Sequence, residues 1–364
     1  MAATIGGFRL TRFEFPRGRV IGDSQVRFDM HYIGALELLA GDGQIGLGFF
    51  GALMYPLPPL AELERVFHTE VLPSLRGQSP FTLLNRQARP RGGNIRSHPF
   101  GQAVDQALWD LAGKELDLQL YRLLGGVDNR VRAYASGLDF HLTPDEFLAF
   151  FAHARERGFT AFKIKVGHPD LARDLERLRL LREVVGPDAT VMVDANEAWS
   201  PKEAIRRAHA YRDAGFAIYW LEDPCLRDDF AGLARVAEAV PFALVNSGEY
   251  LDLRGKRFLL EHRGVDILNV HGTISDSLRA AWLAAEYGIP VSLGNTPFEI
   301  GVHLAAALPE AHWLEYSFQD YDQLVAEPVV FEQGYALAPD RPGHGLALAA
   351  AAGDYARPDV GRGS

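Results

Sequence analysis

The stretch AFKIKVGHPDLARDLERLRLLREVVGPDATVMVDA (residues 161–195) decides the fold. An apolar run at 161–166 is followed by a helical pattern at 169–185 and by a second apolar run at 190–195. A strand, a helix and a further strand in this order predict a βαβ unit, in which the two strands lie parallel in one sheet.

The same alternation continues on both sides of this unit. Six further strands are expected, at Val131–Ser136, Ala217–Leu221, Ala243–Asn246, Val265–Val270, Pro290–Leu293 and Trp313–Tyr316. Helical patterns lie between strands, for example at Pro144–Glu156, Pro201–Ala214 and Ser275–Tyr287. Eight strands at this interval favour a closed α/β barrel. An open doubly wound sheet is the alternative, but its usual Gly-rich phosphate loop is missing after the first strand, where the chain reads Ala135-Ser136-Gly137-Leu138.

The first 125 residues have a different, α+β pattern. The runs Ala35–Leu39 and Ile45–Phe50 flank the turn Gly41-Asp42-Gly43, which predicts a hairpin. Apolar residues at helical spacing between Phe100 and Ala112 predict an amphipathic helix.

Composition excludes several classes of protein. The chain of 364 residues carries a net charge of −10, which argues against a nucleic-acid partner. The single cysteine, Cys225, excludes a disulfide framework and a cysteine-cluster metal site. We find no signal-peptide pattern and no apolar run long enough to span a membrane, and therefore expect a cytoplasmic protein.

Acidic residues follow three consecutive predicted strands. Asp194, Glu222 and Glu249 are separated by 28 and 27 residues, about one βα unit each. Strand ends of a parallel barrel share one rim, so three carboxylates converge there and repel one another unless a cation lies between them. Carboxylate oxygens select Mg²⁺ over softer metals. The alternative is that each acid is a helix N-cap or a surface ion-pair partner.

Two lysines end the second predicted strand. Lys163 and Lys165 point to the same face, roughly 7 Å apart, while Ile164 points to the helices. Neighbouring cations would lower a lysine pKa toward the range of a general base. Solvated lysines at an exposed strand end are the alternative.

Together these segments resemble the enolase superfamily, close to the mandelate racemase and muconate lactonizing group. The matching segments occur in the family's order, as AVDQALWDLAGK (103–114), FKIKVG (162–167), VMVDANEAW (191–199), WLEDP (220–224), SGEY (247–250) and PEAHWLEY (309–316).

The resemblance implies a modified TIM barrel, (β/α)7β, over residues 126–326. It implies an α+β capping domain over residues 1–125 that is completed by residues 327–364. Cap loops at about Phe15–Arg27 and Phe49–Pro58 would determine substrate choice. The implied reaction removes the proton α to a carboxylate, and one Mg²⁺ on Asp194, Glu222 and Glu249 stabilises the enediolate.

Site residues carried over by resemblance include Lys165 as the base and Lys163 as its electrostatic partner. Glu315 matches an acid that hydrogen-bonds the substrate carboxylate, which requires it to be protonated or strongly hydrogen-bonded. Two further positions depart from the family, because His271 and Asn295 stand where racemases have Asp and His. His271 is expected across the mouth from Lys165, as a second acid or base or as a structural residue.

Substrate contacts are expected from four further residues, Asn196, Asn295, Tyr55 and Arg17. A single base fits elimination best, so the sequence favours a Mg²⁺-dependent dehydratase of a sugar acid or other hydroxy acid. A racemase, epimerase or cycloisomerase is the alternative, and a non-catalytic metabolite-binding relative or assembly subunit is a third. A small carboxylate ligand and a homo-oligomer are expected, with neither nucleic acid nor membrane as partner.

Overall fold

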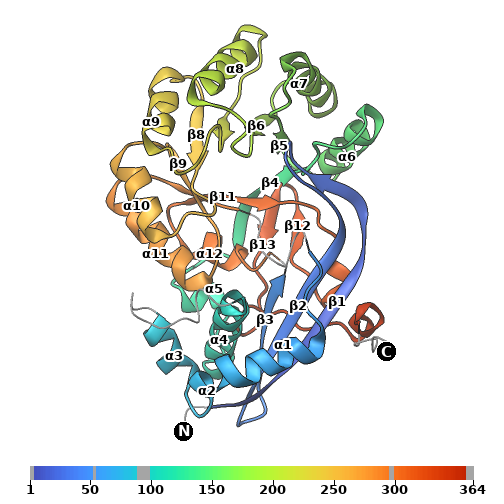
Figure 1. Ribbon diagram of the computed structural model, residues 1–364, viewed down its shortest axis with the longest axis vertical. Helices are drawn as coiled ribbons and strands as arrows, with labels where there is room; N and C mark the ends of the chain where they lie inside the picture. Colours follow the sequence, from blue (N-terminus) through green and yellow to red (C-terminus); the bar gives the residue numbers. More distant parts are fainter. Residues whose placement is uncertain (1–3, 52–54, 88–98, 295–298, 358–364) are drawn as a thin grey trace.

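The computed structural model describes residues 4–51, 55–87, 99–294 and 299–357. Two sheets organise these residues: a three-stranded antiparallel sheet near the N-terminus and a ten-stranded sheet that contains the barrel (Figure 1). Within the described ranges, no helix has the length and apolar character needed to cross a membrane.

The barrel has the eight strands expected from the sequence. In chain order they are β4 (Arg130–Ser136), β5 (Ala161–Lys165), β6 (Thr190–Asp194), β7 (Trp220–Glu222), β8 (Leu244–Ser247), β9 (Ile267–Val270), β10 (Val291–Leu293) and β11 (Ala311–Tyr316). Each pairs in parallel with the next, and β11 returns to β4, so the barrel is closed. The prediction of a barrel is confirmed, and the open doubly wound sheet is excluded.

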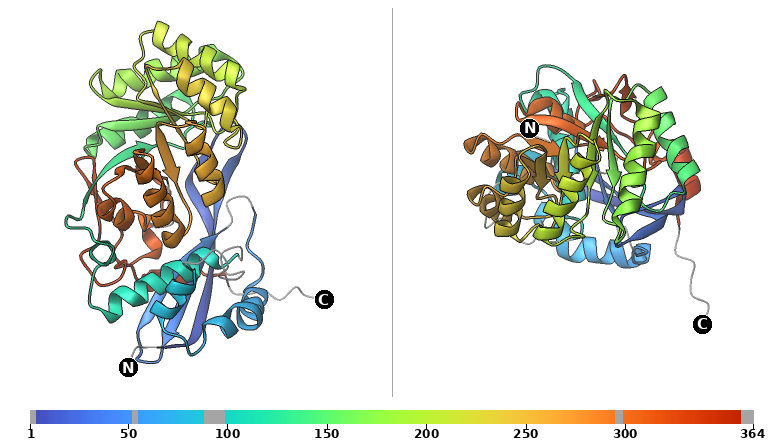
Figure 2. Two further views of the ribbon diagram at one scale, coloured as in Figure 1. Left: turned by 90° about the vertical axis from the view of Figure 1, so that its left-hand side faces the viewer. Right: turned by 90° about the horizontal axis from the view of Figure 1, so that it is seen from above.

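Helices surround these strands, as the views from the side and from above show (Figure 2). They are α6 (Pro144–Glu156), α7 (Leu171–Val185), α8 (Pro201–Asp213), α9 (Phe230–Ala239), α10 (Leu253–Glu261), α11 (Ile274–Glu286) and α12 (Val302–Ala307). Local sequence sets their starts: α6 begins with a capping box in which Thr143 and Glu146 satisfy each other's backbone N–H groups.

Side-chain alternation divides each strand between two environments. Tyr134, Met192, Trp220, Ile267 and Trp313 fill the barrel interior. Ile164 belongs instead to the large cluster between strands and helices, as its position between two lysines predicts. The polar residues at the ends of the same strands therefore lie directly above this packed apolar interior.

The N-terminal sheet consists of β1 (Ile5–Gly22), β2 (Arg27–Ala40) and β3 (Ile45–Gly51). Strands β2 and β3 form the expected hairpin, but the expectation of a loop at Phe15–Arg27 is wrong. Strand β1 continues through this segment to Gly22, with an irregularity between Pro16 and Ile21, and only residues 23–26 form the turn into β2.

Helix α4 (Gly101–Glu115) packs directly on strand β3. The side chains of Gln106 and Asp110 accept hydrogen bonds from the backbone N–H groups of Phe49 and Leu47 at 2.8 and 2.9 Å. These backbone N–H groups at the edge of the sheet thus find their hydrogen-bond acceptors on the helix. Around it lie the smaller helices α1 (Leu60–Val66), η1 (Phe67–Val71), α2 (Leu72–Leu75), α3 (Pro80–Gln87) and α5 (Leu120–Leu123).

The C-terminal residues contact both parts of the molecule. They form η3 (Asp322–Leu324), β12 (Val330–Glu332), β13 (Tyr335–Leu337) and η4 (Ala350–Tyr355). Strand β13 pairs with the barrel strand β4, whereas the backbone N–H of His344 donates to Asp110 of α4 at 3.1 Å. The boundaries at residues 125 and 327 stay a prediction.

Strands β1 and β2 extend beyond their own sheet to the barrel (Figures 1 and 2). These two strands form the β1–β2 hairpin. At its end, Gly22 N–H donates to the carbonyl of Leu138 at 2.9 Å, and the His141 ring lies 2.9 Å from the carbonyl of Val26. The hairpin end is therefore fixed beside the carboxyl ends of β4 and β5.

We expect Gly48→Ala to destabilise the fold, because a Cβ at residue 48 would lie 2.0 Å from the carbonyl oxygen of Ala103 in α4. Neither backbone can yield without separating β3 from α4, so a loss of about 1–3 kcal/mol is expected in thermal or urea unfolding. Gly7→Ala in β1 is the matched control, because its nearest neighbour would be 3.8 Å away. Equal stability of the two variants would contradict this account of the interface.

Candidate active site

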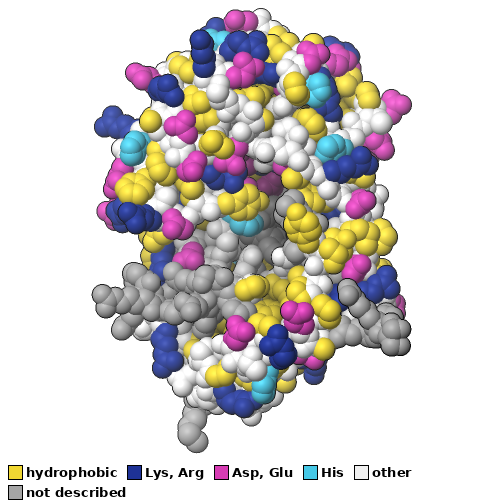
Figure 3. Space-filling model, in the orientation of Figure 1, with side chains coloured by type: hydrophobic (Ala, Val, Ile, Leu, Met, Phe, Trp, Pro, Cys, Tyr) yellow, Lys and Arg dark blue, Asp and Glu magenta, His cyan; other side chains and the backbone are white. Residues whose placement is uncertain are grey.

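A cavity of about 270 Å³ lies at the carboxyl ends of the barrel strands. Its wall is formed by the end of the β1–β2 hairpin and by residues that follow five of the barrel strands. Acidic and basic side chains surround a hollow in the face of the molecule shown in Figure 3. It is lined by Ile21, Gly22, Asp23, Gln25, Val26, Phe28, Leu138, Lys163, Lys165, Asp194, Asn196, Glu197, Glu222, Arg227, Glu249, Tyr250, Glu315 and Gln319.

Lys163 stands at the centre of the charged groups. Its Nζ lies 2.7 Å from Glu222, 3.1 Å from Glu315 and 3.4 Å from Asp194, on three different strands. Burial alone would lower the pKa of Lys163, but the carboxylates of Glu222 and Glu315 outweigh it and raise the pKa well above its ordinary value. This ammonium group is therefore a fixed positive charge.

The charge of Lys163 also acts on Glu315. Burial would raise the pKa of Glu315, but Lys163 and then Lys165 outweigh it and lower the pKa. Of the two expected states of Glu315, protonated or strongly hydrogen-bonded, the ion pair with Lys163 at 3.1 Å favours the second.

Lys165 forms a second ion pair, in which Nζ lies 2.5 Å from Asp194 Oδ2. Burial would lower the pKa of Lys165, but Asp194 outweighs it and raises the pKa. Asp194 outweighs the lowering of this pKa by burial and by Lys163, and the further lowering expected from a metal ion stays a prediction. The pair in turn lowers the pKa of Asp194 to about 2, against the effect of its own burial.

The negative charges of Glu222 and Glu249 are less well balanced by nearby cations. Burial, followed by nearby carboxylates, raises the pKa of Glu249 to about 7. Burial also raises the pKa of Glu222 well above its ordinary value, although Lys163 opposes this. Both shifts mean that additional positive charge at these oxygens would be favourable.

The donor types suit a hard divalent cation, because Asp194, Glu222 and Glu249 supply only carboxylate oxygens from adjacent positions of the ring. Across the described ranges, no three His, Cys, Asp or Glu side chains are already drawn together as a metal site. The ammonium of Lys163 instead contacts two of these acids. Residue type and charge therefore fit Mg²⁺.

Surrounding groups hold the charged side chains in position. Asn269 Nδ2 and Trp220 Nε1 donate to the two oxygens of Glu222 at 3.2 and 3.1 Å. Asp139, itself paired with Arg177, accepts from the backbone N–H of Lys165 at 3.1 Å. These buried contacts fix the ends of β5 and β7.

Lys256 of α10 has a similar supporting position outside the cavity. Its Nζ donates to the backbone carbonyls of Asn269, at 3.2 Å, and of Gly248. It thereby links the ends of β8 and β9, beside Glu249. The sequence offers no sign of this role, because a lysine on an amphipathic helix is usually solvated.

His271 does not line the cavity that holds Lys165. Its ring packs against Tyr250, with centroids 5.4 Å apart, and its Nδ1 lies 4.0 Å from Glu249. It lines a second, wider cavity together with Lys256, Thr273 and Arg279. The strand position was predicted correctly, but the side chain does not lie across the cavity from Lys165.

The predicted substrate contacts are placed unequally. Asn196 lines the cavity, with a positive φ of 46°, and its carbonyl accepts from Gln25. Arg17 does not line it but donates to Gln319, which does, at 3.2 Å. The prediction for Tyr55 is wrong, because its side chain is 68% exposed and away from the cavity lining. Asn295 lies outside the described residues.

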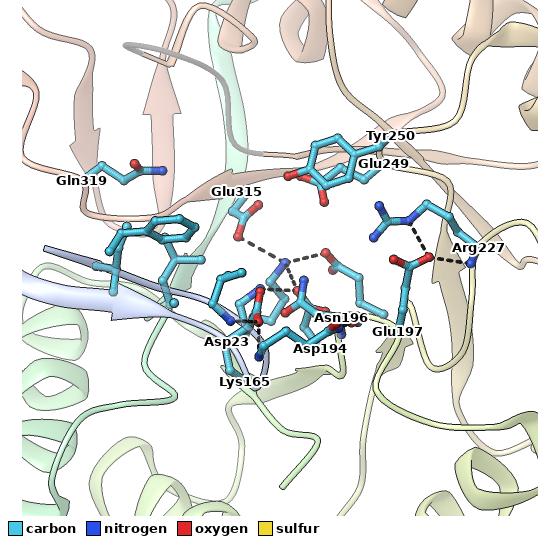
Figure 4. Close-up of a pocket in the computed structure, with 18 residues that line it drawn as sticks. Asp23, Lys165, Asp194, Asn196, Glu197, Arg227, Glu249, Tyr250, Glu315 and Gln319 are labelled. Atoms are coloured by element: carbon cyan, nitrogen blue, oxygen red, sulfur yellow. Dashed lines mark hydrogen bonds and ion pairs between the residues drawn. The ribbon is translucent and has the colours of Figure 1, made fainter. Parts of the chain in front are cut away.

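Several lining residues were missed by the sequence reasoning. Arg227, Glu197 and Tyr250 come from the loops after β7, β6 and β8, and Asp23 comes from the hairpin end (Figure 4). Glu197 and Tyr250 occur within the quoted segments VMVDANEAW and SGEY, so their proximity to the metal carboxylates was a usable signal. Asp23 lies within the segment Phe15–Arg27 that the resemblance links to substrate choice, although the residue itself was not singled out, whereas Arg227 lacked such a signal.

Comparisons with known proteins agree with this geometry. The enolase C-terminal domain-like family matches residues 146–352. The 3,6-anhydro-α-L-galactonate cycloisomerase of Streptomyces coelicolor is 35% identical over 266 residues, 71% of each chain.

Two solved structures show similarity over almost the whole chain. A Mesorhizobium loti protein, provisionally assigned as a mandelate racemase, is 54% identical with a TM-score of 0.94, covering 99% of this chain and 96% of its own. The L-talarate/galactarate dehydratase of Salmonella typhimurium, solved with Mg and L-lyxarohydroxamate, is 26% identical with a TM-score of 0.86, covering 98% and 94%.

We expect Lys163→Met to destabilise the fold by about 3–5 kcal/mol near pH 7.5, because it leaves buried carboxylates without their shared cation. In the wild type, Lys165 and Lys163 lower the pKa of Asp194 to about 2 against its burial, so its ion pairs persist well below pH 5. In the variant, burial without the charge of Lys163 raises the pKa values of the remaining carboxyl groups, so protons replace the missing cation as pH falls. The deficit of the variant should therefore shrink between pH 7.5 and 5.

The measurement is urea unfolding in chelator-containing buffer at several pH values. Lys202→Met, at an exposed position of α8, is the matched control and should show little change at any pH. A pH-independent deficit for Lys163→Met would indicate lost packing and contradict the electrostatic account.

Proposed function

Because the chain belongs to the enolase superfamily, in its mandelate racemase and muconate lactonizing group, we propose that it is a Mg²⁺-dependent dehydratase of a sugar acid or other hydroxy acid. One observation carries the proposal: two lysines from one strand meet three carboxylates from the next strands in one cavity. This arrangement suits removal of a weakly acidic proton α to a carboxylate, where negative charge develops next to fixed positive charge.

Asp194, Glu222 and Glu249 are the residues that would hold Mg²⁺. When bound, the ion supplies positive charge at the substrate carboxylate as the enediolate forms. The similarity to the Salmonella dehydratase solved with Mg supports this assignment.

Lys165 is the proposed base, because its Nζ lies in the cavity wall while its backbone is held by Asp139. A base must lie within hydrogen-bond reach of the proton that it takes, and the fixed backbone limits where Nζ can go. Lys163 is the proposed electrostatic partner, since it already holds three carboxylates and is buried. Glu315, held by Lys163, would position the substrate's polar groups as a hydrogen-bond acceptor.

Elimination is favoured over isomerisation by the arrangement of the described lining residues. They place both lysines on one strand, and His271 does not face Lys165 across the cavity. One base can remove the α-proton and return it to the β-hydroxyl on the same face, which then leaves as water as the Cα–Cβ double bond forms. Isomerisation instead needs a second group that delivers a proton to the opposite face. The similarity to the Streptomyces cycloisomerase keeps isomerisation as the second candidate.

A non-catalytic role is the least supported of the three functions, because both lysines and the three proposed metal carboxylates line one cavity. We further propose a cytoplasmic location and assembly into a homo-oligomer. The location rests on the single, buried cysteine, and the assembly rests on the family resemblance.

We expect Lys165→Met to abolish loss of the substrate α-hydrogen, because no other described lining residue on β5 can reach the same position. The measurement is exchange of that hydrogen in D₂O, followed by mass spectrometry over a library of acid sugars with Mg²⁺. Loss of water identifies a dehydratase, and exchange with retained substrate identifies an isomerase. A Lys165→Met variant that is folded and exchanges at the wild-type rate would show that the base is another residue.

We expect Glu222→Gln to reduce turnover by roughly 10³-fold or more while leaving the fold intact, because the amide keeps its volume but loses the charge that holds the cation. Turnover and Mg²⁺ binding by calorimetry should be lost together. Glu238→Gln, on the exposed side of α9, should behave as wild type in both measurements. Full turnover of Glu222→Gln after chelator treatment would contradict the metal assignment.

A further inference from the structure

We propose that this cavity selects monocarboxylates whose far end is uncharged and rejects matched dicarboxylates, with Asp23 as the residue that discriminates. The inference rests on the proposed function, since it concerns the substrate of the same cavity. It is carried by the charges, the polar contacts and the apolar wall of the lining residues.

The described lining carries an excess of negative charge. Three cationic groups, Lys163, Lys165 and Arg227, face six carboxylates, which are Asp23, Asp194, Glu197, Glu222, Glu249 and Glu315. A bound Mg²⁺ and the two lysines would neutralise the carboxylates at the ends of the barrel strands and the carboxylate at the reacting end of the substrate. Among the described lining residues, the cation that remains for a second substrate carboxylate is Arg227.

Arg227 is already committed to protein carboxylates. Its Nη2 lies 2.6 Å from Asp223, and its Nε lies 3.4 Å from Glu197. The backbone N–H of the same residue donates to Glu197 at 2.8 Å, and the guanidinium stacks 4.7 Å from the centroid of the Tyr250 ring. A ligand carboxylate would have to compete with two acids for one guanidinium.

Asp23 places a further negative charge at the hairpin end. Its Oδ1 accepts from the backbone N–H groups of Gln25 at 2.7 Å and Val26 at 3.1 Å, so the turn itself fixes this side chain. The close-up shows it on the same side of the cavity as Lys165 and Asp194 (Figure 4). A carboxylate held there accepts hydrogen bonds from ligand hydroxyls and repels a ligand carboxylate.

Apart from Gln25, whose Nε2 donates to the carbonyl of Asn196, the rest of the hairpin wall is apolar. Ile21, Val26 and Phe28 line the cavity beside Leu138, and none of these side chains can donate a hydrogen bond. An ionised carboxylate placed against such a wall loses hydration without gaining a partner. The carbon skeleton or the neutral end of a monocarboxylate carries no such cost.

The inference separates chemistries that occur among the relatives. Galactonate-type acids carry one carboxylate, as in the name of the Streptomyces cycloisomerase, whereas galactarate, named in the Salmonella dehydratase, carries two. The charges around Asp23 place this chain with enzymes of the first kind.

The first test compares matched pairs of five- and six-carbon acid sugars, each an aldonate and the aldarate of the same configuration. We expect kcat/KM for α-hydrogen loss, with Mg²⁺ present, to be at least about tenfold higher for the aldonate of the best pair. An aldarate that is used as well as its aldonate overturns the inference. If no acid in the set loses its α-hydrogen, the proposed function fails, and calorimetric binding of the same pairs still decides the inference.

The second test uses Asp23→Asn, which keeps the Oδ1 acceptor of the turn and removes only the charge. The ratio of kcat/KM, or of affinity, between aldonate and aldarate should fall by about tenfold. Asp42→Asn is the matched control, because Asp42 Oδ1 accepts from Gln44 N–H in the other hairpin of the same sheet. An unchanged ratio in Asp23→Asn, with Asp42→Asn also unchanged, would show that Asp23 does not discriminate and would overturn its assignment.

Discussion

The convergence of carboxylates at one end of the barrel is the constraint on which the rest of this structure depends. Parallel strands bring Asp194, Glu222 and Glu315 to one buried point, where their charges can coexist only around a cation. Lys163 supplies that cation on the neighbouring strand, at 2.7–3.4 Å from all three. Burial nevertheless raises the pKa values of Glu222 and Glu249, so their charges are only partly compensated, and this is the reason that the site fits a divalent ion.

Most of the barrel could be predicted because its signals are local. Each strand is a short apolar run, and each helix from α6 to α11 begins at a residue whose side chain caps it. Because the strand ends of a parallel barrel necessarily meet, Lys163, Lys165 and the acids were placed correctly. The β1–β2 hairpin was harder to predict, because FPRGR (residues 15–19) contains proline, glycine and two arginines and looks like a loop. It is held as strand β1 by pairing with β2, a contact between distant residues that leaves no local pattern.

The directions of side chains and the coupling between their charges could not be predicted from the sequence. His271 has the expected strand position but lines a different cavity, and Tyr55 is on the surface. The pKa of Lys165 depends on a carboxylate 2.5 Å away, which spacing along the chain cannot reveal. Arg227 and Asp23 were missed for a related reason, since loop residues reach the cavity only through turns such as the one that positive φ values create at Asn196 and Glu197.

The central claim is that one divalent cation completes the charge balance among Asp194, Glu222 and Glu249. The most direct measurement is the anomalous scattering of Mn²⁺, used in place of Mg²⁺, in crystals of the wild-type protein. The account predicts one strong peak per chain within coordination distance of these three side chains, together with movement of Lys165 Nζ away from Asp194. A peak elsewhere, or none at saturating Mn²⁺, would contradict it.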